Sequence, residues 1–483
     1  MISRRDAFLA GATLALAPAF ARAAPVEAPA EAPGARPSDD WALADRILAR
    51  IKPPTFPDRD FPLEAFGGDP RGVADSSQAF RKAIAAASGA GGGRVVVRRG
   101  DWLTGPIHLQ SNVELHLAEG AVVRFKTDPR AYLPLVFTRW EGVELMNYSP
   151  FVYAIDCENI AITGSGTFDG QCSRENWWPW KGPWKQNQHG WAEGMADQRP
   201  ARERLFRMAE DRTPVAQRLF GEGSYLRPPF IQPYRCRNVL IEGVKLRHAP
   251  FWQLHPVLCT NVTIRRVDVD SHGPNNDGCD PESCTDVLIE DCTFATGDDC
   301  IALNSGRNED GRRVGVPCQN VIIRGCRMAD GHGGITIGSQ ISGHVRNVFA
   351  ENCRLDSPNL DYAIRFKNNA LRGGLVERIR YRNLQVGQVR QAVVTVDFNY
   401  EEGADGPFTP VLRDVVIENV RSGRSARAVD LQGLPTGRVE RITLRDCDFQ
   451  GVAGPSVVKF VKGLALENVR VNGKLVRDLT TGA

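Results

Sequence analysis

Apolar residues recur at fixed offsets in nine segments spread through the second half of the chain. Within each segment, the residues one, three, six and eight positions after the first are apolar, with Ser422 as the exception, and successive segments start 22 to 36 residues apart. Alternation on either side of a short corner indicates two strands that meet at a bend. The segments start at Asn238, Asn261, Asp286, Asn320, Asn347, Arg378, Asp414, Arg441 and Gly463.

This repeat predicts an all-β fold, a parallel β-helix whose successive turns stack about 4.8 Å apart. A β-propeller is the alternative, but its blades need roughly 40 residues in four antiparallel strands. The end of such a coil exposes strand edges. Ser76 and Ser77, followed by the apolar-rich stretch 79–85, predict an N-cap and a helix that covers the first turn. Weaker repeats at 112–117 and 159–162 extend the coil toward the N-terminus.

The repeat is interrupted by an insertion at about residues 171–234. We expect this tryptophan-rich segment to pack beside or over a groove, because aromatic rings suit the faces of sugars. For each ring, packing of the insertion onto the coil is an equally good interpretation. Five of the nine tryptophans lie there: Trp177, Trp178, Trp180, Trp184 and Trp191.

The N-terminus carries Arg4 and Arg5 before an apolar run at 7–20 and small residues at 21–23, which predicts an export signal resembling the bacterial twin-arginine type. A buried first helix is the alternative. We therefore expect a periplasmic or secreted protein, without stable membrane association and monomeric. The expected division is a signal at 1–23, a leader or linker at 24–50, and a single β-helix catalytic domain at 51–483.

Composition and charge disfavour several classes of protein. Lys and Arg number 60 against 57 Asp and Glu, a net charge of +3 over 483 residues, which disfavours nucleic acid as a partner. Twelve cysteines are too sparse for a disulfide scaffold, and no His/Cys spacing predicts a zinc site, so no cofactor or metal is expected. Pairs Cys279–Cys284 and Cys300–Cys318 remain open as loop disulfides. Four cysteines share one interior column and are expected to be apolar fillers: Cys292, Cys326, Cys353 and Cys447.

Polar residues gather on consecutive turns of the predicted coil. When the apolar pair Ile301/Leu303 is aligned with Ile335/Ile337, Asp298 and His332 fall side by side. Asp277 lies two residues before Cys279, and Asp299 lies two residues before Ile301. This predicts that the two aspartates share one column of equivalent positions, next to the column of Asp298 and His332. Arg365 and Lys367 alternate with Ile364 and Phe366, so both cations should face away from the core.

Three neighbouring carboxylates repel one another, so at least one should keep a proton at neutral pH. A protonated carboxyl beside an ionised one provides the acid and the base that cleavage of a glycosidic bond requires. The two cations indicate a substrate that carries carboxylate, because Arg binds it bidentately and Lys as a point charge.

The motif order Asn-x-Asp, Gly-Asp-Asp, Gly-His-Gly and Arg-x-Lys resembles that of the polygalacturonase family of glycoside hydrolases, family 28, and the chain looks closest to its bacterial exo-acting members. The resemblance implies a right-handed parallel β-helix and hydrolysis of pectin with inversion. It implies Asp298 as general acid, Asp277 and Asp299 as the residues that hold the water, and His332 as support for the acid. The substrate-binding residues that it implies are Arg365, Lys367, Asn275 and Tyr400.

Asn304 stands where many bacterial relatives carry Lys, Asn276 replaces a common Thr, and Phe366 a common Ile. The Gly-His-Gly and Arg-x-Lys motifs favour galacturonate at the cleaved bond. The predicted activity is hydrolysis of α-galacturonic acid linkages in polygalacturonan or oligogalacturonides, from a chain end. The alternatives are a pectin or pectate lyase, which needs calcium and a basic residue, a non-catalytic carbohydrate-binding β-helix, and a hydrolase of rhamnogalacturonan-type pectin.

Overall fold

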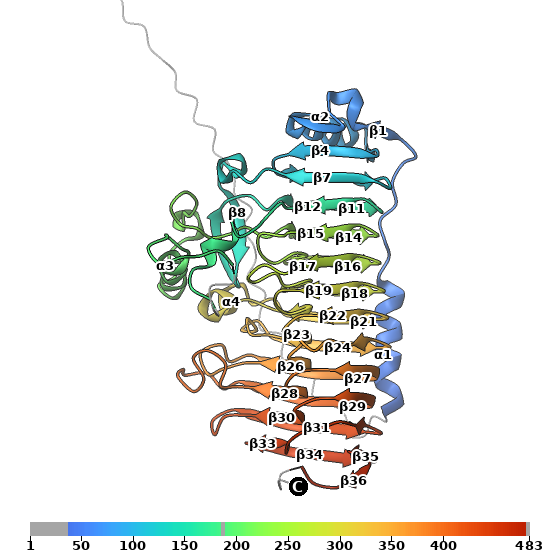
Figure 1. Ribbon diagram of the computed structural model, residues 1–483, viewed down its shortest axis with the longest axis vertical. Coiled ribbons are helices and arrows are strands. Elements are labelled where there is room, and N and C mark those ends of the chain that lie inside the picture. The colour runs from blue at the N-terminus through green and yellow to red at the C-terminus, as the bar shows by residue number, and fades with distance from the viewer. Residues whose placement is uncertain (1–36, 185–188, 480–483) are drawn as a thin grey trace, which may run out of the picture.

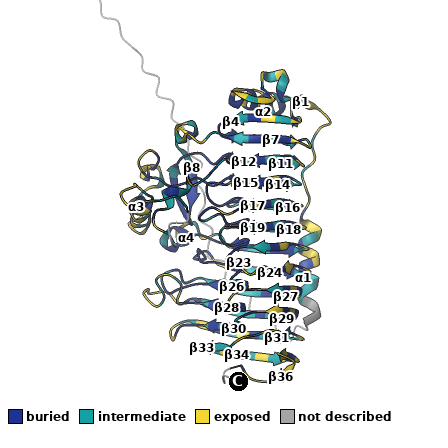
Figure 2. Cartoon of the chain, in the orientation of Figure 1, coloured by how far each residue is buried: buried dark blue, intermediate teal, exposed yellow. Residues whose placement is uncertain are grey.

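The computed structural model describes residues 37–184 and 189–479. The predicted export signal and the first part of the predicted leader lie outside these residues. The chain forms a right-handed parallel β-helix whose turns follow one another from the N-terminal to the C-terminal end (Figure 1), as the repeat predicted. Buried residues run along the stacked strands, and exposed ones lie on helices α1 (Pro37–Arg50) and α3 (Arg199–Glu210) (Figure 2).

Each turn contributes up to three strands. The first strand of the turns is supplied in order by β1 (Asp60–Pro62), β3 (Gly93–Val97), β6 (Val113–Leu117), β11 (Glu158–Gly164), β14 (Arg237–Glu242), β16 (Thr260–Arg265), β18 (Thr285–Glu290), β21 (Cys318–Arg324), β24 (Val345–Glu351), β27 (Leu375–Gln388), β29 (Val411–Arg424), β31 (Arg438–Arg445) and β34 (Val461–Glu467). The second strand, beyond the corner, is supplied by β2 (Arg71–Asp75), β4 (Gly100–Thr104), β7 (Ala121–Phe125), β12 (Thr167–Asp169), β15 (Lys245–Arg247), β17 (Asp268–Ser271), β19 (Thr293–Thr296), β22 (Arg327–Asp330), β25 (Arg354–Leu355), β32 (Asp448–Phe449) and β35 (Val469–Val471), which β36 (Lys474–Val476) closes antiparallel.

The third strands form two separate sheets. One contains β5 (Ile107–His108), β10 (Val152–Ile155) and β13 (Ile231–Tyr234). The other contains β20 (Ile301–Leu303), β23 (Gly333–Ile337), β26 (Tyr362–Lys367), β28 (Ala392–Asp397), β30 (Arg427–Gln432) and β33 (Val457–Lys459). This six-stranded sheet carries the polar motifs.

The pairing register confirms the alignment made from the sequence. Val239 pairs with Val262, which pairs with Val287, and the column continues turn by turn to Leu464. Nearly all of its members are buried, so the apolar ladders form one core along the coil. All twelve cysteines are free thiols, and eleven are buried, so the loop disulfides left open by the sequence do not form.

The first residue of every repeat segment makes a second corner, within the first strand of its turn, where its backbone is in the left-handed region. The nine φ angles range from 53° to 69°. Asn, Asp and Gly tolerate this conformation better than other residues do, which explains why they begin most segments. Their side chains also stack: the Asn320 amide donates to Asp286 (2.9 Å) and accepts from the Asn347 amide (2.8 Å).

Helix α2 (Ser77–Gly89) covers the first turn as predicted (Figure 1). Ser76 is its N-cap residue, but the capping hydrogen bond expected from its side chain is absent. The Ser76 hydroxyl instead accepts from the Asp69 amide (3.1 Å), and the Ser77 amide donates to Asp75 Oδ1 (2.9 Å). The cap is therefore made by the preceding aspartate.

The predicted linker at 24–50 is wrong in its second half, because residues 37–50 form helix α1. This helix lies against the outside of the coil and buries Ala44 and Ile47 against three outward-facing apolar residues. Those are Leu288, Ile322 and Phe349, at equivalent positions of β18, β21 and β24. Asp40 adds an ion pair with Arg380 (2.8 Å). Burial of Ala44 and Ile47 on one face of the helix explains why residues 37–50 are helical.

Two excursions lie beside the coil on one side (Figure 1). One is the antiparallel hairpin of β8 (Val136–Trp140) and β9 (Val143–Asn147), and the other is the tryptophan-rich insertion with α3. They share an apolar core of their own. The hairpin is tied to the coil by Arg139, which is 0% exposed and pairs with the buried Glu282 (3.3 Å).

The remaining short helices are α4 (Asn308–Val314) and the 3-10 turns η1 (Leu63–Phe66), η2 (Pro129–Tyr132), η3 (Trp178–Lys181) and η5 (Val215–Gln217). In the part of the chain that the structure describes, no helix has the length and apolar character needed to cross a bilayer.

The corner ladder makes a testable prediction. Asn320→Gly removes two side-chain hydrogen bonds but keeps a residue suited to positive φ, so we expect a loss of about 1–3 kcal/mol in the free energy of unfolding. Asn320→Ala should lose about 1 kcal/mol more, because alanine must adopt a φ of 59°. Denaturant unfolding of both variants measures the difference, and an alanine variant as stable as the glycine variant would contradict the role of the corner.

Candidate active site

A polar cavity of about 380 Å³ opens beside the six-stranded sheet. Its lining includes seven of the eight predicted site residues: Asn275, Asp277, Asp298, His332, Arg365, Lys367 and Tyr400. The eighth, Asp299, is fully buried and contacts two of those lining residues. The four motifs therefore meet at one place in the fold, as the predicted register required.

Asp298 and His332 lie side by side. Ile301 pairs with Ile335 and Leu303 with Ile337, the register predicted from the sequence. The backbone amide of His332 donates to the Asp298 carbonyl (2.9 Å), and His332 Nδ1 lies 3.0 Å from Asp298 Oδ1. Burial opposes ionisation of Asp298, but His332, Lys367 and Arg365 outweigh it and lower the pKa of this carboxyl.

Asp299 forms ion pairs with both predicted cations. Its two oxygens accept from Arg365 Nη1 (3.1 Å) and from Lys367 Nζ (2.7 Å). Burial disfavours charge on these two cations, but Asp299 outweighs it and raises the pKa of each. Both side chains also line the cavity, so they stay charged at its surface, where a carboxylate could be bound.

Asp277 is the carboxyl that keeps a proton. Cys279 and Ile301 form a bridge, which places Asp277 and Asp299 in neighbouring turns as predicted. Asp277 is 5% exposed, and its Oδ1 has no hydrogen-bond partner among the described residues. Burial, followed by the charge of Asp298, raises the pKa of Asp277 well above its ordinary value.

The first motif also contains residues that shape the loop. Asn276 is fully buried, and its Oδ1 accepts from the Ser271 hydroxyl (2.6 Å) and the Gly273 amide (2.9 Å). Asn275 lines the cavity and accepts from Arg227 (2.8 Å). Asn276 therefore holds the loop that carries Asp277, and Asn275 remains accessible to a ligand.

Asp280 is a further carboxyl at the site and was not among the predicted residues. This residue is fully buried beside the cluster, and neither of its carboxylate oxygens has a partner among the described residues. Burial and then the charge of Asp299 raise the pKa of Asp280 well above its ordinary value. Its signal in the sequence was its place one residue after Cys279, an interior position of the coil.

The insertion and the hairpin contribute lining residues that sequence analysis also missed, apart from Trp184, which was noted as part of the insertion. They are Glu141, Lys181, Trp184 and Arg202. Trp177 is buried against Tyr132 and Phe151, whereas Trp184 lines the cavity, so each of the two interpretations of the rings applies to one of these tryptophans.

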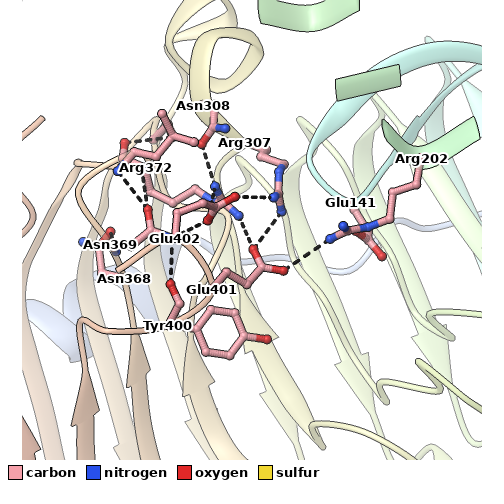
Figure 3. A network of polar contacts seen from close by, with 12 residues as sticks. Glu141, Arg202, Arg307, Asn308, Asn368, Asn369, Arg372, Tyr400, Glu401 and Glu402 are labelled. Atoms are coloured by element: carbon pink, nitrogen blue, oxygen red, sulfur yellow. Dashed lines mark hydrogen bonds and ion pairs between the residues drawn. The ribbon is translucent and has the colours of Figure 1, made fainter. Parts of the chain in front are cut away.

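An ion-pair network borders the cavity (Figure 3). Glu401 pairs with Arg202 of the insertion (3.2 Å), with Arg307 (3.1 Å) and with Arg372. Arg202 also pairs with Glu141 of the hairpin (2.8 Å). Burial opposes ionisation of Glu401, but Arg307, Arg372 and Arg202 outweigh it and lower its pKa to about 2. The network thus joins the hairpin, the insertion and three loops of the coil that are distant in the sequence.

The same network positions Tyr400. Asn369 donates to the Tyr400 carbonyl (3.0 Å) and to Glu402 (2.8 Å). The Tyr400 ring lies 5.2 Å from Lys367 Nζ and 5.8 Å from the Arg365 guanidinium carbon. The ring is therefore held against the two cations that pair with Asp299.

Within residues 37–184 and 189–479, the acidic side chains spaced closely enough for a cation are Asp277, Asp298 and Asp299, whose oxygens lie within 4.8 Å of one another. Asp299 is already balanced by Arg365 and Lys367, and Asp298 by His332. The positive charge that a metal would bring is thus supplied by the protein itself.

A parallel β-helix that exposes a protonated and an ionised carboxyl in one polar cavity has the composition of a glycoside hydrolase site. Residues 221–466 match the sequence profile of the glycosyl hydrolases family 28. The chain belongs to this family and is a glycoside hydrolase.

Individual relatives agree with this assignment. A hyperthermoactive exopolygalacturonase from Thermotoga maritima is 44% identical, with a TM-score of 0.88 over 92% of this chain and 99% of that one. A probable polygalacturonase of Vitis vinifera is 29% identical over 77% of this chain and 71% of its own length. The chain spans only 50% of a probable polygalacturonase of Arabidopsis thaliana, to which it is 28% identical.

Asp280 should make stability depend on pH. Its raised pKa means that the folded protein keeps a proton that the unfolded chain loses above about pH 4, so stability falls as pH rises until the folded pKa is reached. Asp280→Asn removes this titration. The free energy of unfolding of this variant, relative to wild type, should therefore rise with pH above 4, by at most about 1.4 kcal/mol per pH unit.

Denaturant unfolding between pH 4 and pH 7 measures this difference. Asp405→Asn, at an exposed aspartate, serves as the matched control. Parallel stability curves for wild type and Asp280→Asn would contradict a buried, protonated Asp280.

Proposed function

We propose that this glycoside hydrolase cleaves α-galacturonic acid linkages in polygalacturonan or oligogalacturonides, with inversion and from a chain end. The observation that carries the proposal is the meeting of a protonated Asp277 and an ionised Asp298 with two cations in one cavity. The carboxyl pair suits glycosidic cleavage, and Arg365 and Lys367 suit a sugar that carries carboxylate. The polygalacturonase names of the relatives support the same substrate.

The proposed roles follow from the charges. Asp298 donates a proton to the departing glycosidic oxygen, and Asp277 and Asp299 hold the water that attacks the anomeric carbon. Asp277 takes the proton that the water loses, because Asp299 is neutralised by its two ion pairs. One turnover then leaves Asp277 protonated and Asp298 ionised, which is the state favoured in the free protein. Transfer of that proton to Asp298 starts the next turnover, with His332 supporting the acid.

The spacing and the bonding of the three carboxyls bear on whether cleavage inverts the anomeric carbon. The closest oxygens of the three carboxyls lie within 4.8 Å, shorter than the roughly 6.5–9.5 Å usual in inverting enzymes. A retaining mechanism, however, needs an ionised carboxylate free to attack carbon. Asp299 is bound by two cations and Asp298 is bound by His332, and Asp277, once it has passed its proton to Asp298, acts as the base for the water. Water is therefore the better nucleophile.

Action from a chain end is supported by the network around Glu401. Glu141, Arg202 and Glu401 all line the cavity and are joined by ion pairs (Figure 3). A polysaccharide that ran past this side of the cavity would have to separate these ion pairs. The similarity to an exopolygalacturonase at 44% identity supports the same conclusion.

Export remains part of the proposal. The paired arginines and the apolar run at 7–20 favour a periplasmic or secreted location. The amino-terminal residue of the mature protein, determined after cell fractionation, decides this point.

Asp298→Asn tests the chemistry. Loss of the carboxyl removes proton donation, which contributes about 10²–10⁴-fold to such reactions, so release of reducing sugar from trigalacturonate should fall at least a hundredfold. Circular dichroism should show an unchanged fold. A variant with wild-type activity would remove Asp298 from the mechanism, and an unsaturated product that absorbs in the ultraviolet would indicate a lyase instead.

The products released over time test the proposed action from a chain end and the proposed inversion. In proton NMR of an oligogalacturonide digest, one small product should dominate from the first minutes, with its new reducing end in the β form. A ladder of intermediate lengths would refute chain-end action, and an initial α product would refute inversion.

A further inference from the structure

Five basic side chains line the cavity, and they differ in their partners. Arg365 and Lys367 pair with Asp299, His332 with Asp298, and Arg202 with Glu141 and Glu401. Lys181 is the exception: among the described residues, no carboxylate lies within ion-pair or hydrogen-bonding distance of its ammonium group.

Lys181 is nevertheless held in place. It ends the turn η3, and its Nζ lies 4.7 Å from the centre of the Trp184 ring, which also lines the cavity. The preceding residue, Trp180, packs on Trp177 (4.7 Å between ring centres), and its carbonyl accepts from the Gln198 amide (2.8 Å). The ammonium group is therefore fixed at the cavity wall by aromatic packing rather than by an opposite charge.

This arrangement opposes the charge of Lys181. Burial, above all, lowers the pKa of Lys181, and the nearby charges of Arg227 and Arg202 act in the same direction. Glu141 and Asp298 act in the opposite direction but do not restore its ordinary value. A cation held in this way lacks a counter-charge, which a bound anionic group would supply.

We infer that Lys181 binds the carboxylate of a second acidic sugar, adjacent to the sugar whose carboxylate meets Arg365 and Lys367. The inference rests on the proposed function. The two binding groups come from different parts of the fold: Arg365 and Lys367 from β26 of the coil, and Lys181 from the insertion. Two consecutive uronic acids would thus be recognised together, and a neutral neighbouring sugar would be disfavoured.

The test compares Lys181→Met with Lys181→Arg on trigalacturonate and on the trigalacturonates that carry one methyl ester, one for each position. Lys181→Met should raise KM for trigalacturonate about tenfold, or about 1.4 kcal/mol, with kcat within about threefold of wild type. Lys181→Arg should restore most of the loss. For one monoester, the one that lacks the contacted carboxylate, wild type and Lys181→Met should have the same KM.

A wild-type KM for Lys181→Met on trigalacturonate would overturn the inference, as would an equal rise of KM on trigalacturonate and all monoesters, which a merely structural role predicts. Lys245→Met, at an exposed lysine of β15, is the matched control and should leave KM unchanged.

Failure of the proposed function has a different signature, because wild-type protein would then release nothing from trigalacturonate. The inference is then judged by calorimetric binding of digalacturonate to Asp298→Asn, with and without Lys181→Met. Weaker binding by the double variant supports the contact, and equal binding overturns it.

Discussion

Stacked parallel strands hold each polar residue of the site at the height of its own turn. The left-handed corner residues and the apolar columns inside the coil keep adjacent turns in register. A shift of one residue in β20 or β23 would turn Ile301 or Ile335 away from the core, because neighbouring positions of a strand face opposite sides, and would separate the bends that carry Asp298 and His332. The contact between Asp298 and His332, on residues 34 positions apart, therefore depends on packing inside the coil as much as on the two side chains.

A second constraint is the balance of charge. Buried carboxylates are tolerated when cations or protons compensate them. Here Asp299 is compensated by Arg365 and Lys367, Asp298 by His332, and Asp277 and Asp280 by the protons that their raised pKa values retain. The same balance gives the carboxyls unequal proton affinities, which acid–base chemistry requires.

Sequence reasoning was reliable wherever the period of the coil applied. The columns and the neighbours Asp298 and His332 follow from spacing alone, since parallel stacking turns an offset in sequence into a position in space. It failed where the chain leaves the coil. Helix α1 was taken for a linker, although the outward-facing apolar residues Leu288, Ile322 and Phe349 signalled a covered surface. Lys181 and Arg202 could not be placed, because an insertion without a repeat has no register.

This division explains how the site is built. Coil residues cannot change much without disturbing the columns above and below them, so the coil carries the reacting carboxyls. The hairpin and the insertion have their own core and join the coil through buried pairs such as Arg139 with Glu282. Their cavity-facing residues are therefore free to differ without affecting the register. We therefore propose that Glu141, Lys181 and Arg202 adjust which sugar chains the cavity accepts, whereas the stacked turns supply the carboxyls and the cations Arg365 and Lys367.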